Sequence, residues 1–438
     1  MSSPSSDRAY WKPKEETLAR NELEALQLAR LRETVERVFE RVPLYRRKLD
    51  EAEVTPKAMR GLDDLRRLPF TTGADLRDAY PTAMLAVPFD ETLRLHTSSG
   101  TTGKPKAIFF SRQDVDNAAE LIARSFVATG MGRKDVFQNM MTYGLFTGAL
   151  VAHYGAEKIG CLVIPAGPGN SDRQLLLMQD FHSTSIHLTP SFALYFADFL
   201  EKRGIDPRKD LALRRAFIGA EAYSEETRRK IEDGLGVAAF NSYGLSEMNG
   251  PGVAFECLER RGMHLWEDHF LMEIIDPETG AVLPPGERGE LVLTTLMREA
   301  MPILRYRTRD ITAIIDEPCT CGRTHRRIER IAGRTDDMLV VRGVNFYPQQ
   351  IERILMGVPG VGRNYLIVLD GLDQMTVKIE AANRGGEDQL ARTAALQDEI
   401  AARLRAEILT KPRVELVPPG TLPASEGKAR RVIDNRKL

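Results

Sequence analysis

A short run of hydroxyl, glycine and lysine residues carries the strongest chemical signal in this 438-residue chain. Gly100 and Gly103 let the backbone approach a ligand and direct amide hydrogens toward it, while neighbouring hydroxyls donate to phosphate oxygens and lysines offset charge. The candidate contacts are Ser98, Ser99, Gly100, Thr101, Thr102, Gly103, Lys104 and Lys106. We therefore expect this segment to hold the polyphosphate of a nucleoside triphosphate.

The flanking residues predict a hairpin. Leu93 and Leu95 alternate as in a strand, and a second apolar run covers residues 107–110. The P-loop pattern requires four residues between its glycines, whereas two separate Gly100 from Gly103. A polar surface turn is the alternative interpretation.

Three later segments are also rich in groups that bind ligands: Asn241–Glu247, Tyr306–Asp310 and Gly333–Asp337. Taken alone, the first reads as a strand end with a turn. The second reads as a surface ion pair of Asp310 with a neighbouring arginine, and the third as a glycine-flanked acidic loop.

In this order, the four segments resemble the nucleotide-binding motifs of the adenylate-forming enzymes, the superfamily of acyl-CoA synthetases, luciferases and peptide-synthetase adenylation domains. The resemblance implies that Tyr243, followed by Gly244, packs on adenine and that Ser246 reaches the α-phosphate. It implies that Glu247 ligates Mg²⁺, a hard cation that prefers oxygen ligands. Ser246 replaces the usual threonine and keeps its hydroxyl.

The same resemblance assigns further nucleotide contacts. Asp310 would accept hydrogen bonds from both ribose hydroxyls, and Arg334 would touch the ribose. The run Gly219, Ala220 and Glu221 resembles the adenine-contact segment, although the next residue is alanine where proline is more usual.

Lys428 stands where the superfamily carries its catalytic lysine on a loop. An ammonium that bridges the carboxylate and the α-phosphate would stabilise the transition state of adenylation. Asp336 would be the hinge about which a small domain rotates between acyl-AMP formation and transfer of the acyl group to CoA. The alternative is that Lys428 belongs to a solvated basic tail.

Within the superfamily, nearly the whole chain resembles the phenylacetate-CoA ligase branch, including the segment Trp11–Tyr45 and two segments near the expected acid pocket, Tyr143–Gly148 and His153–Glu157. Tyr143 and Phe146 could sandwich an aromatic ring for which Gly148 leaves room. Aromatic residues at such spacing also serve as core. The absence of an obvious cation among them favours a plain aryl acid.

Three of the four cysteines could gather a metal ion. Cys257, Cys319 and Cys321, with His264, make a Cys₃His set suited to structural zinc. His325 is an equally available fourth ligand, and spacing does not choose between the two histidines. Some members of the branch carry a zinc cluster whose arrangement resembles the set with His264. The remaining cysteine, Cys161, reads as core.

Composition limits the class of protein. The net charge of −1, from 61 basic and 62 acidic residues, shows no excess of basic residues of the kind that binds nucleic acid. No apolar run reaches the 18 residues of a membrane span and no signal peptide is visible, so we expect a cytoplasmic protein. Length and the hinge motif predict a large multi-layer α/β N-terminal domain at residues 1–335 and a small α+β C-terminal domain at 336–438, with a homodimer plausible.

The sequence thus predicts an AMP-forming aryl-acid CoA ligase that uses ATP, Mg²⁺ and CoA and contains structural zinc. Two alternatives remain open: an adenylase that passes an aryl group to a carrier protein, and a nonenzymatic ATP-sensing or zinc scaffold protein.

Overall fold

The computed structural model describes residues 9–97, 105–341, 344–370, 374–382, 389–410, 412–423 and 429–436. Its contacts divide the chain into two compact units that alternate along the sequence. The first unit contains Met1–Gly167, Thr184–His187 and Phe240–Arg330, and the second contains Pro168–Ser183, Leu188–Ala239 and Ile331–Leu438. The predicted domain boundary at residues 335/336 lies near the last of these divisions and stays a prediction.

Helices of the first unit precede and follow its β-hairpin. They are α1 (Pro13–Glu16), α2 (Arg20–Arg41), α3 (Pro43–Glu51), α4 (Gly73–Asp78), α5 (Arg112–Ala128) and α6 (Thr147–Ile159), with the 3₁₀ turns η1 (Pro56–Ala58), η2 (Leu62–Arg67), η3 (Phe89–Glu91) and η4 (Ser246–Met248).

The strands of the first unit form four groups. The hairpin is β1 (Thr92–Thr97) with β2 (Ala107–Ser111), and β3 (Val136–Asn139) pairs in parallel with β4 (Leu162–Ile164) and β5 (Ser185–Leu188). An antiparallel run joins β7 (Ala238–Leu245), β8 (Gly250–Glu256), β9 (Met263–Leu265), β14 (Arg327–Ile328) and β13 (Ile314–Ile315). A further antiparallel set is β10 (Phe270–Ile275), β11 (Gly289–Thr295) and β12 (Tyr306–Thr312).

The second unit begins with helices around one strand and continues into the C-terminal part of the chain. Its first elements are α7 (Ser171–Asp180), α8 (Pro190–Lys202), α9 (Pro207–Asp210), β6 (Arg215–Gly219) and α10 (Glu225–Leu235). The later ones are β15 (Gly333–Arg334), β16 (Leu339–Val341), β17 (Val344–Phe346), α11 (Pro348–Met356), β18 (Val361–Asp370), β19 (Gln374–Ala381), α12 (Gln389–Ile408), β20 (Arg413–Val417) and β21 (Val432–Asp434).

Local sequence explains how the hairpin leads into α5. Ser111 ends β2 and also caps the helix: its side chain accepts a hydrogen bond from the Asp114 amide, and Asp114 accepts one from the Ser111 amide. This capping box satisfies two amides that the first helical turn leaves without partners. The Asp114 carboxylate also accepts from the amides of Glu299 and Ala300, which fixes the helix start against a distant loop.

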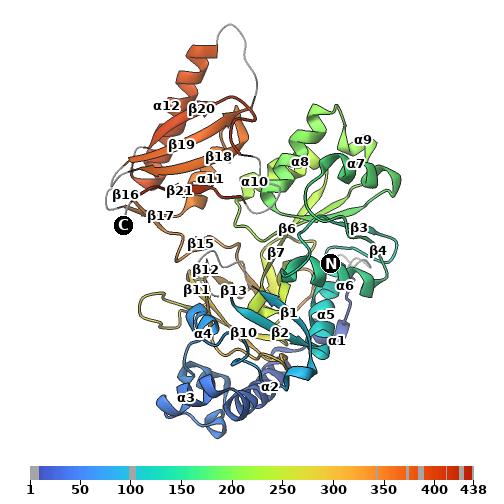
Figure 1. The fold of residues 1–438 in the computed structure, drawn as a ribbon, viewed down its shortest axis with the longest axis vertical. Coiled ribbons are helices and arrows are strands. Elements are labelled where there is room, and N and C mark those ends of the chain that lie inside the picture. Colours follow the sequence, from blue (N-terminus) through green and yellow to red (C-terminus); the bar gives the residue numbers. More distant parts are fainter. Residues whose placement is uncertain are drawn as a thin grey trace, which may run out of the picture. The chain divides into compact units, whose positions relative to one another are not determined.

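A glycine sets the spacing of α5 and α6, which lie side by side in Figure 1. A Cβ placed on Gly155 would lie 2.2 Å from the side chain of Ile122. The two helices can approach this closely only because Gly155 lacks a side chain. This contact fixes the face that α6 turns toward α5, and with it the direction of the neighbouring His153.

The C-terminal strands have a core of their own. They follow the order β20-β19-β18-β21, in which the central pair is antiparallel and the outer pairs are parallel. Apolar side chains of α11 and α12 pack against this sheet, including Ile351, Leu355, Ile400 and Leu404. Figure 1 shows the two helices beside the sheet. The predicted α+β character of this part is confirmed.

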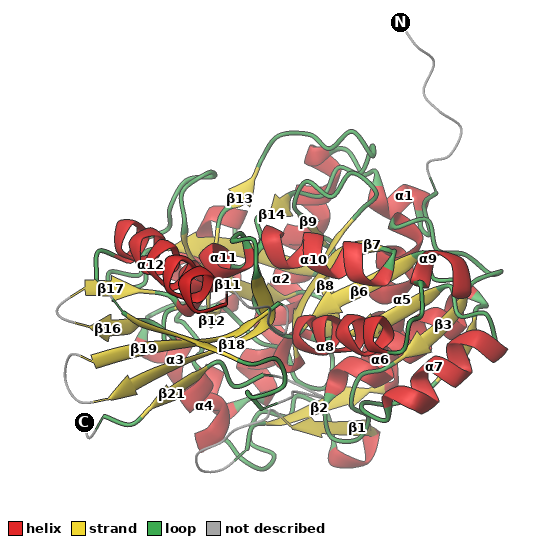
Figure 2. Ribbon diagram, turned by 90° about the horizontal axis from the view of Figure 1, so that it is seen from above, coloured by secondary structure: helices red, strands yellow, loops and turns green. Residues whose placement is uncertain are grey.

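The mixed α/β class is confirmed as well, with helices and strands interleaved through the described chain (Figure 2). The predicted hairpin is correct, because Thr97 of β1 pairs with Ala107 of β2. Cys161 is buried, as predicted. Among the described helices none is long and apolar enough to cross a membrane.

Candidate active site

The β1–β2 hairpin delivers Lys106 to Glu247. The residues between the paired ends of the strands include the predicted phosphate segment, of which Ser98, Ser99, Gly100, Thr101, Thr102, Gly103 and Lys104 lie outside the described residues. Lys106 is described, and its Nζ lies 2.5 Å from Oε1 of Glu247. Lys106, the last of the predicted phosphate contacts, is therefore in contact with the predicted Mg²⁺ ligand.

Glu247 is a buried carboxylate that stays ionised. Burial alone would raise its pKa, but the charge of Lys106 and the hydrogen bonds from Lys106 and Tyr306 hold the pKa below its usual value. The hydroxyl of Tyr306 donates to Glu247 Oε1 at 2.9 Å, and Lys106 Nζ also reaches that hydroxyl at 3.2 Å. A negative charge kept in a dry site is suited to a divalent cation.

A second contact joins the same two segments. The hydroxyl of Tyr243 donates to Oδ2 of Asp310 at 2.6 Å, and both residues are buried. Tyr243 and Glu247 lie at the end of β7 and in η4, while Asp310 and Tyr306 lie on β12. The earlier residue of the first segment, Tyr243, contacts the later residue of the second, Asp310, whereas Glu247 contacts the earlier Tyr306. The two segments are therefore antiparallel, and the predicted adenine, ribose and Mg²⁺ contacts are brought together.

The alternative interpretation of this segment was a surface ion pair between Asp310 and a neighbouring arginine, and the contacts of Arg307 argue against Arg307 as that partner. Its guanidinium pairs with Glu290, which is fully buried, at 2.5 Å, so it is not the ion-pair partner that Asp310 would have needed. Along β12 the residues alternate between buried and more exposed positions, so Tyr306 and Asp310 share the buried face.

The glycine at position 244 has a steric reason. A Cβ there would lie 1.9 Å from the carbonyl oxygen of Gly250 on β8, so any side chain would push the two strands apart. The pairing of β7 and β8 shifts register between Tyr243 and Gly244. Two further pairs, Gly244 with Pro251 and Leu245 with Gly250, follow this irregularity before the chain turns into η4, where Ser246 is half-buried and Glu247 is buried.

The predicted acid-pocket segment lies beside the end of β1. The amide of Thr97 donates to the carbonyl of Leu145 at 2.9 Å, and Nδ1 of His96 lies 3.2 Å from the same oxygen. Burial lowers the pKa of His96 to about 4, so the ring is neutral and Nδ1–H donates. The segment that contains Tyr143 is therefore fastened next to the start of the predicted phosphate loop.

Tyr143 is held by a chain of hydrogen bonds. Its hydroxyl receives a bond from Asn139 Nδ2 at 2.9 Å and lies 3.2 Å from Nδ1 of His153, whose Nε2 lies 3.0 Å from a carboxylate oxygen of Glu157. The carboxylate can only accept, so Nε2 of His153 carries a proton. Burial raises the pKa of Tyr143 to about 12, so the phenol stays neutral.

The other predicted pocket residues differ in environment. Phe146 is the residue before α6 and is 42% exposed, so it is not a core residue. A Cβ on Gly148 would meet nothing within 4 Å, so the space beside this glycine is open. Both observations agree with a surface that could receive a ring, and neither tests the contact.

Predicted contacts in the second unit also have defined partners. Glu221 accepts hydrogen bonds from the hydroxyl of Ser191 at 2.6 Å and the amide of Ala429 at 2.7 Å. Gly219 ends β6, and Ala220 adopts a positive φ of 71°, which is uncommon for a residue with a side chain. Burial raises the pKa of Glu221.

The hinge segment contains an internal ion pair. Arg334 Nε lies 2.9 Å from Oδ1 of Asp336, and the guanidinium also contacts Oδ2 at 3.1 Å. Their roles at the ribose and at the hinge stay predictions. Lys428 lies outside the described residues.

The four predicted zinc ligands come together. The sulfur and nitrogen atoms of Cys257, His264, Cys319 and Cys321 all lie within 4.8 Å of one another. Cys257 Sγ and Cys319 Sγ are 3.8 Å apart, and Cys321 Sγ is 3.3 Å from His264 Nε2. A tetrahedron with metal–sulfur bonds of about 2.3 Å has an edge of about 3.8 Å, so the donor set fits zinc.

Strand pairing explains this cluster. His264 on β9 pairs with Phe255 on β8, and Cys257 follows β8 directly. His264 also pairs with Arg327 on β14, so residues 316–326, between β13 and β14, return Cys319 and Cys321 to the same place. We call residues 316–326 the cluster loop.

His264, and not His325, completes the set. Nδ1 of His264 donates to the carbonyl of His325 at 2.9 Å, which leaves Nε2 directed at the cysteines. Both ring nitrogens of His325 are used elsewhere: Nδ1 accepts from the Glu267 amide and Nε2 donates to the Glu15 carbonyl, each at 2.9 Å. Hydrogen bonds from Cys257 and Cys319 lower the pKa of Cys321, which favours a thiolate.

Sequence reasoning missed Tyr306 and His153. Tyr306 is in the quoted ribose segment, but nothing in that segment signals a bond to a residue about 60 positions earlier. His153 and Glu157 did carry a signal, because a spacing of four on a helix places two side chains on one face.

Comparison with known proteins shows the family to which the chain belongs. The model of the AMP-binding enzyme family matches residues 20–297, and that of the AMP-binding enzyme C-terminal domain matches residues 343–436. A phenylacetate-coenzyme A ligase of Thermus thermophilus is 48% identical, covering 98% of this chain and all of that protein. One from Escherichia coli K12 is 44% identical over 97% of each chain.

A solved structure shares the fold over almost the full length. The 2-hydroxyisobutyryl-CoA ligase in its postadenylation state, in complex with 2-HIB-AMP, aligns with a TM-score of 0.91 at 28% identity, covering 99% of this chain and 94% of that one. The chain therefore belongs to the AMP-binding, adenylate-forming enzyme family and, within it, to the phenylacetate-CoA ligase-like AMP-forming acid–thiol ligases.

Proposed function

We propose that this protein is an aryl-acid CoA ligase. In the first half reaction a carboxylate oxygen of the acid attacks the α-phosphorus of ATP, and pyrophosphate leaves. In the second, the sulfur of CoA attacks the acyl carbon, the thiol proton is lost and AMP leaves. The near-complete coverage of relatives named phenylacetate-coenzyme A ligase supports the aromatic acid.

The observation that carries the proposal is the double contact between the segments of Tyr243–Glu247 and Tyr306–Asp310. It gathers a buried carboxylate, a lysine and a tyrosine–aspartate pair in one region, as ATP recognition requires. Asp310 would take the ribose hydroxyls, Tyr243 the adenine and Ser246 the α-phosphate.

Glu247 fits the role of the Mg²⁺ ligand. Mg²⁺, when bound, supplies positive charge that screens the phosphates. Lys106 holds Glu247 ionised and would face the phosphate chain together with the predicted segment Ser98–Lys104. The site thus keeps its negative charge before the cation and the nucleotide arrive.

The acid would bind beside Tyr143. The bonds from Asn139 and to His153 fix the direction of this ring, and the open space beside Gly148 leaves room for an aryl group. Phe146 would cover the other side of that ring. We place Lys428 at the α-phosphate during adenylation and Arg334 at the ribose. We also propose that the chain divides into domains at residues 1–335 and 336–438, and that the second domain rotates about Asp336 between the half reactions.

We further propose a structural zinc ion held by Cys257, His264, Cys319 and Cys321. The tetrahedral spacing and the bond from His264 to the His325 carbonyl support this set. A closed set of four protein donors leaves no open position for chemistry, so the ion would stabilise the fold. The homodimer and cytoplasmic location stay predictions.

Screening aryl acids tests the function directly. We expect phenylacetate-like acids to support exchange of pyrophosphate into ATP, and thioester to form when CoA is added. Thioester formation on a carrier protein but not on CoA would favour the carrier-dependent adenylase. If no acid supports exchange, the nonenzymatic alternative is correct and the proposal fails.

A further inference from the structure

The segment that leads into α2 and includes its first residue, Arg20, is hydrogen-bonded to the cluster loop. We call residues 9–20 the N-terminal strap. It includes α1 and shares no strand pairing with the loop, yet the two are joined by several hydrogen bonds over a separation of about 300 residues. Both belong to the first unit.

Three hydrogen bonds tie the strap to the backbone or ring groups of the loop. The hydroxyl of Tyr10 donates to the backbone carbonyl of Cys321 at 2.9 Å. The sulfur of Cys321 is one of the four donors of the cluster. The amide of Thr324 donates to the carbonyl of Glu16 at 3.2 Å. His325 Nε2 donates to the carbonyl of Glu15 at 2.9 Å.

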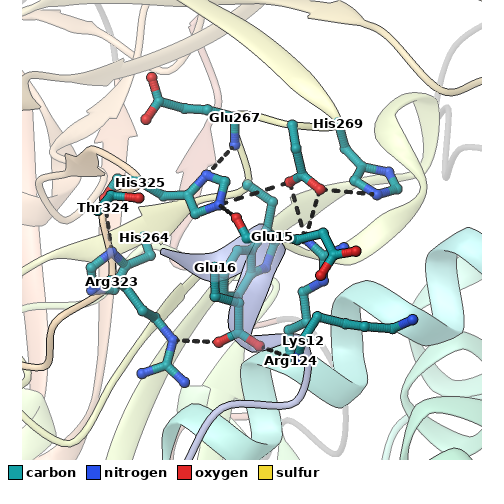
Figure 3. A network of polar contacts seen from close by, with 12 residues as sticks. Lys12, Glu15, Glu16, Arg124, His264, Glu267, His269, Arg323, Thr324 and His325 are labelled. Atoms are coloured by element: carbon teal, nitrogen blue, oxygen red, sulfur yellow. Dashed lines mark hydrogen bonds and ion pairs between the residues drawn. The ribbon is translucent and has the colours of Figure 1, made fainter. Parts of the chain in front are cut away.

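A buried ion pair strengthens this attachment. Nε of Arg323 lies 2.8 Å from Oε2 of Glu16, and another nitrogen of the guanidinium donates to the Ala9 carbonyl at 2.8 Å. Figure 3 shows the two side chains directed at one another between the strap and the loop. Glu16 has no exposed surface and Arg323 is 5% exposed, so separating them would leave a buried charge without its partner.

Glu16 also closes the strap on itself. Its Oε1 accepts hydrogen bonds from the amides of Trp11 and Lys12 at 2.8 and 2.7 Å. The far end of the strap is fastened by Arg20, which forms a bidentate pair with Glu267 and donates to the Thr324 carbonyl. One carboxylate therefore organises the strap and attaches it to the loop.

The cluster loop is the part of the metal site that no strand pairing among the described residues holds in place. Cys257 and His264 are buried at paired strands, whereas Cys319 and Cys321 depend on a loop without a ladder of its own. A metal ion leaves a closed four-donor site only after one or more ligands swing away. The contacts between the strap and the loop oppose that motion.

We propose that the N-terminal strap is a clasp that sets how long the metal stays in the cluster, with Glu16 and Tyr10 as positioning residues for Cys319 and Cys321. This inference rests on the proposed zinc site. It concerns the rate of metal release, since the strap contributes no ligand of its own.

The experiment compares metal release from the full chain and its variants. Zinc is first quantified by elemental analysis, and its transfer to an excess of a chromophoric chelator is then followed by absorbance. Tyr10→Phe removes one hydroxyl and keeps the ring over Arg323. Glu16→Gln breaks the ion pair and keeps the shape of the side chain.

Glu273→Gln is the matched control. Glu273 is also buried and forms a bidentate pair with Arg305, at 2.9 Å for both bonds, in the same unit. It therefore reproduces the loss of a buried arginine–carboxylate pair without touching the strap or the loop.

We expect zinc to leave Tyr10→Phe about fivefold faster than the unaltered protein, the effect of one hydrogen bond. Glu16→Gln should release it on the order of a hundredfold faster, and Glu273→Gln at the unaltered rate. Equal release rates in all four proteins would overturn the clasp and leave the zinc site standing. Absence of zinc from the unaltered protein would overturn both proposals. If Glu16→Gln does not fold, Tyr10→Phe decides.

Discussion

Replacing Lys106 by methionine tests the proposed chemistry of Glu247 most directly. The change keeps most of the side-chain length and removes the charge that lies 2.5 Å from the carboxylate. Lys106 is 18% exposed and Glu247 is 6% exposed, so the pair is mostly shielded from water. Removing one partner of a buried pair costs about 3–5 kcal/mol, and we expect about 3 because Tyr306 still donates to Glu247.

The loss in the free energy of unfolding should be larger at neutral pH than at acidic pH. In the unaltered protein the pKa of Glu247 is held below 4.5, the usual value of a glutamate carboxyl. Its ionisation therefore stabilises the fold above that value, and this contribution is lost as the pH falls through the folded pKa. Without Lys106, burial becomes the dominant effect and should raise the pKa above 4.5. The stability deficit of the variant should therefore be largest near pH 7.5 and shrink toward about pH 5.

Urea unfolding at the two pH values measures the deficit, and pyrophosphate exchange against Mg²⁺ concentration measures the site. Lys48→Met is the control: Lys48 is 19% exposed and pairs with Asp75 at 2.8 Å, and neither residue is one of the proposed ATP contacts. It should lose stability equally at both pH values and keep its Mg²⁺ dependence. If Lys106→Met gives a pH-independent deficit and normal exchange, the assigned coupling of Lys106 to Glu247 is wrong.

Three further predictions concern the acid, the metal and the lysine of the last loop. His153→Phe removes one of the two partners of the Tyr143 hydroxyl, so KM for the aryl acid should rise about fivefold with KM for ATP unchanged; an equal rise in both would refute the positioning role. Cys319→Ser should lose stoichiometric zinc by elemental analysis and lower Tm, while Cys161→Ser should keep its zinc. Lys428→Ala should impair acyl-AMP formation far more than thioester formation from supplied acyl-AMP, and equal losses in both half reactions would contradict its role.

Much of the fold followed from local patterns. The hairpin was predicted from the alternation at Leu93 and Leu95, because a strand exposes every second side chain. The helix after it begins at the capping box of Ser111 and Asp114, which is a local pattern of the same kind. Such signals are short in range, so they survive in the sequence alone.

The identity of the site residues was also local information. The motifs around Tyr243, Asp310 and Arg334 name the residues and their order, because ligand recognition requires particular groups at fixed spacing. For the metal, composition supplied three cysteines, but the choice between His264 and His325 was open. Only the tertiary structure settled it, because Nε2 of His264 points at the sulfurs while hydrogen bonds to backbone groups use both ring nitrogens of His325.

What the sequence determined by itself is therefore the set of chemical groups and the elements that carry them. What only the tertiary structure decided is which groups touch: Tyr306 with Glu247, Tyr143 with His153, and Glu16 with Arg323. Two of these three pairs join residues dozens to hundreds of positions apart. Their free energy comes from burial and from excluded water, which depend on packing and leave no periodic trace along the chain.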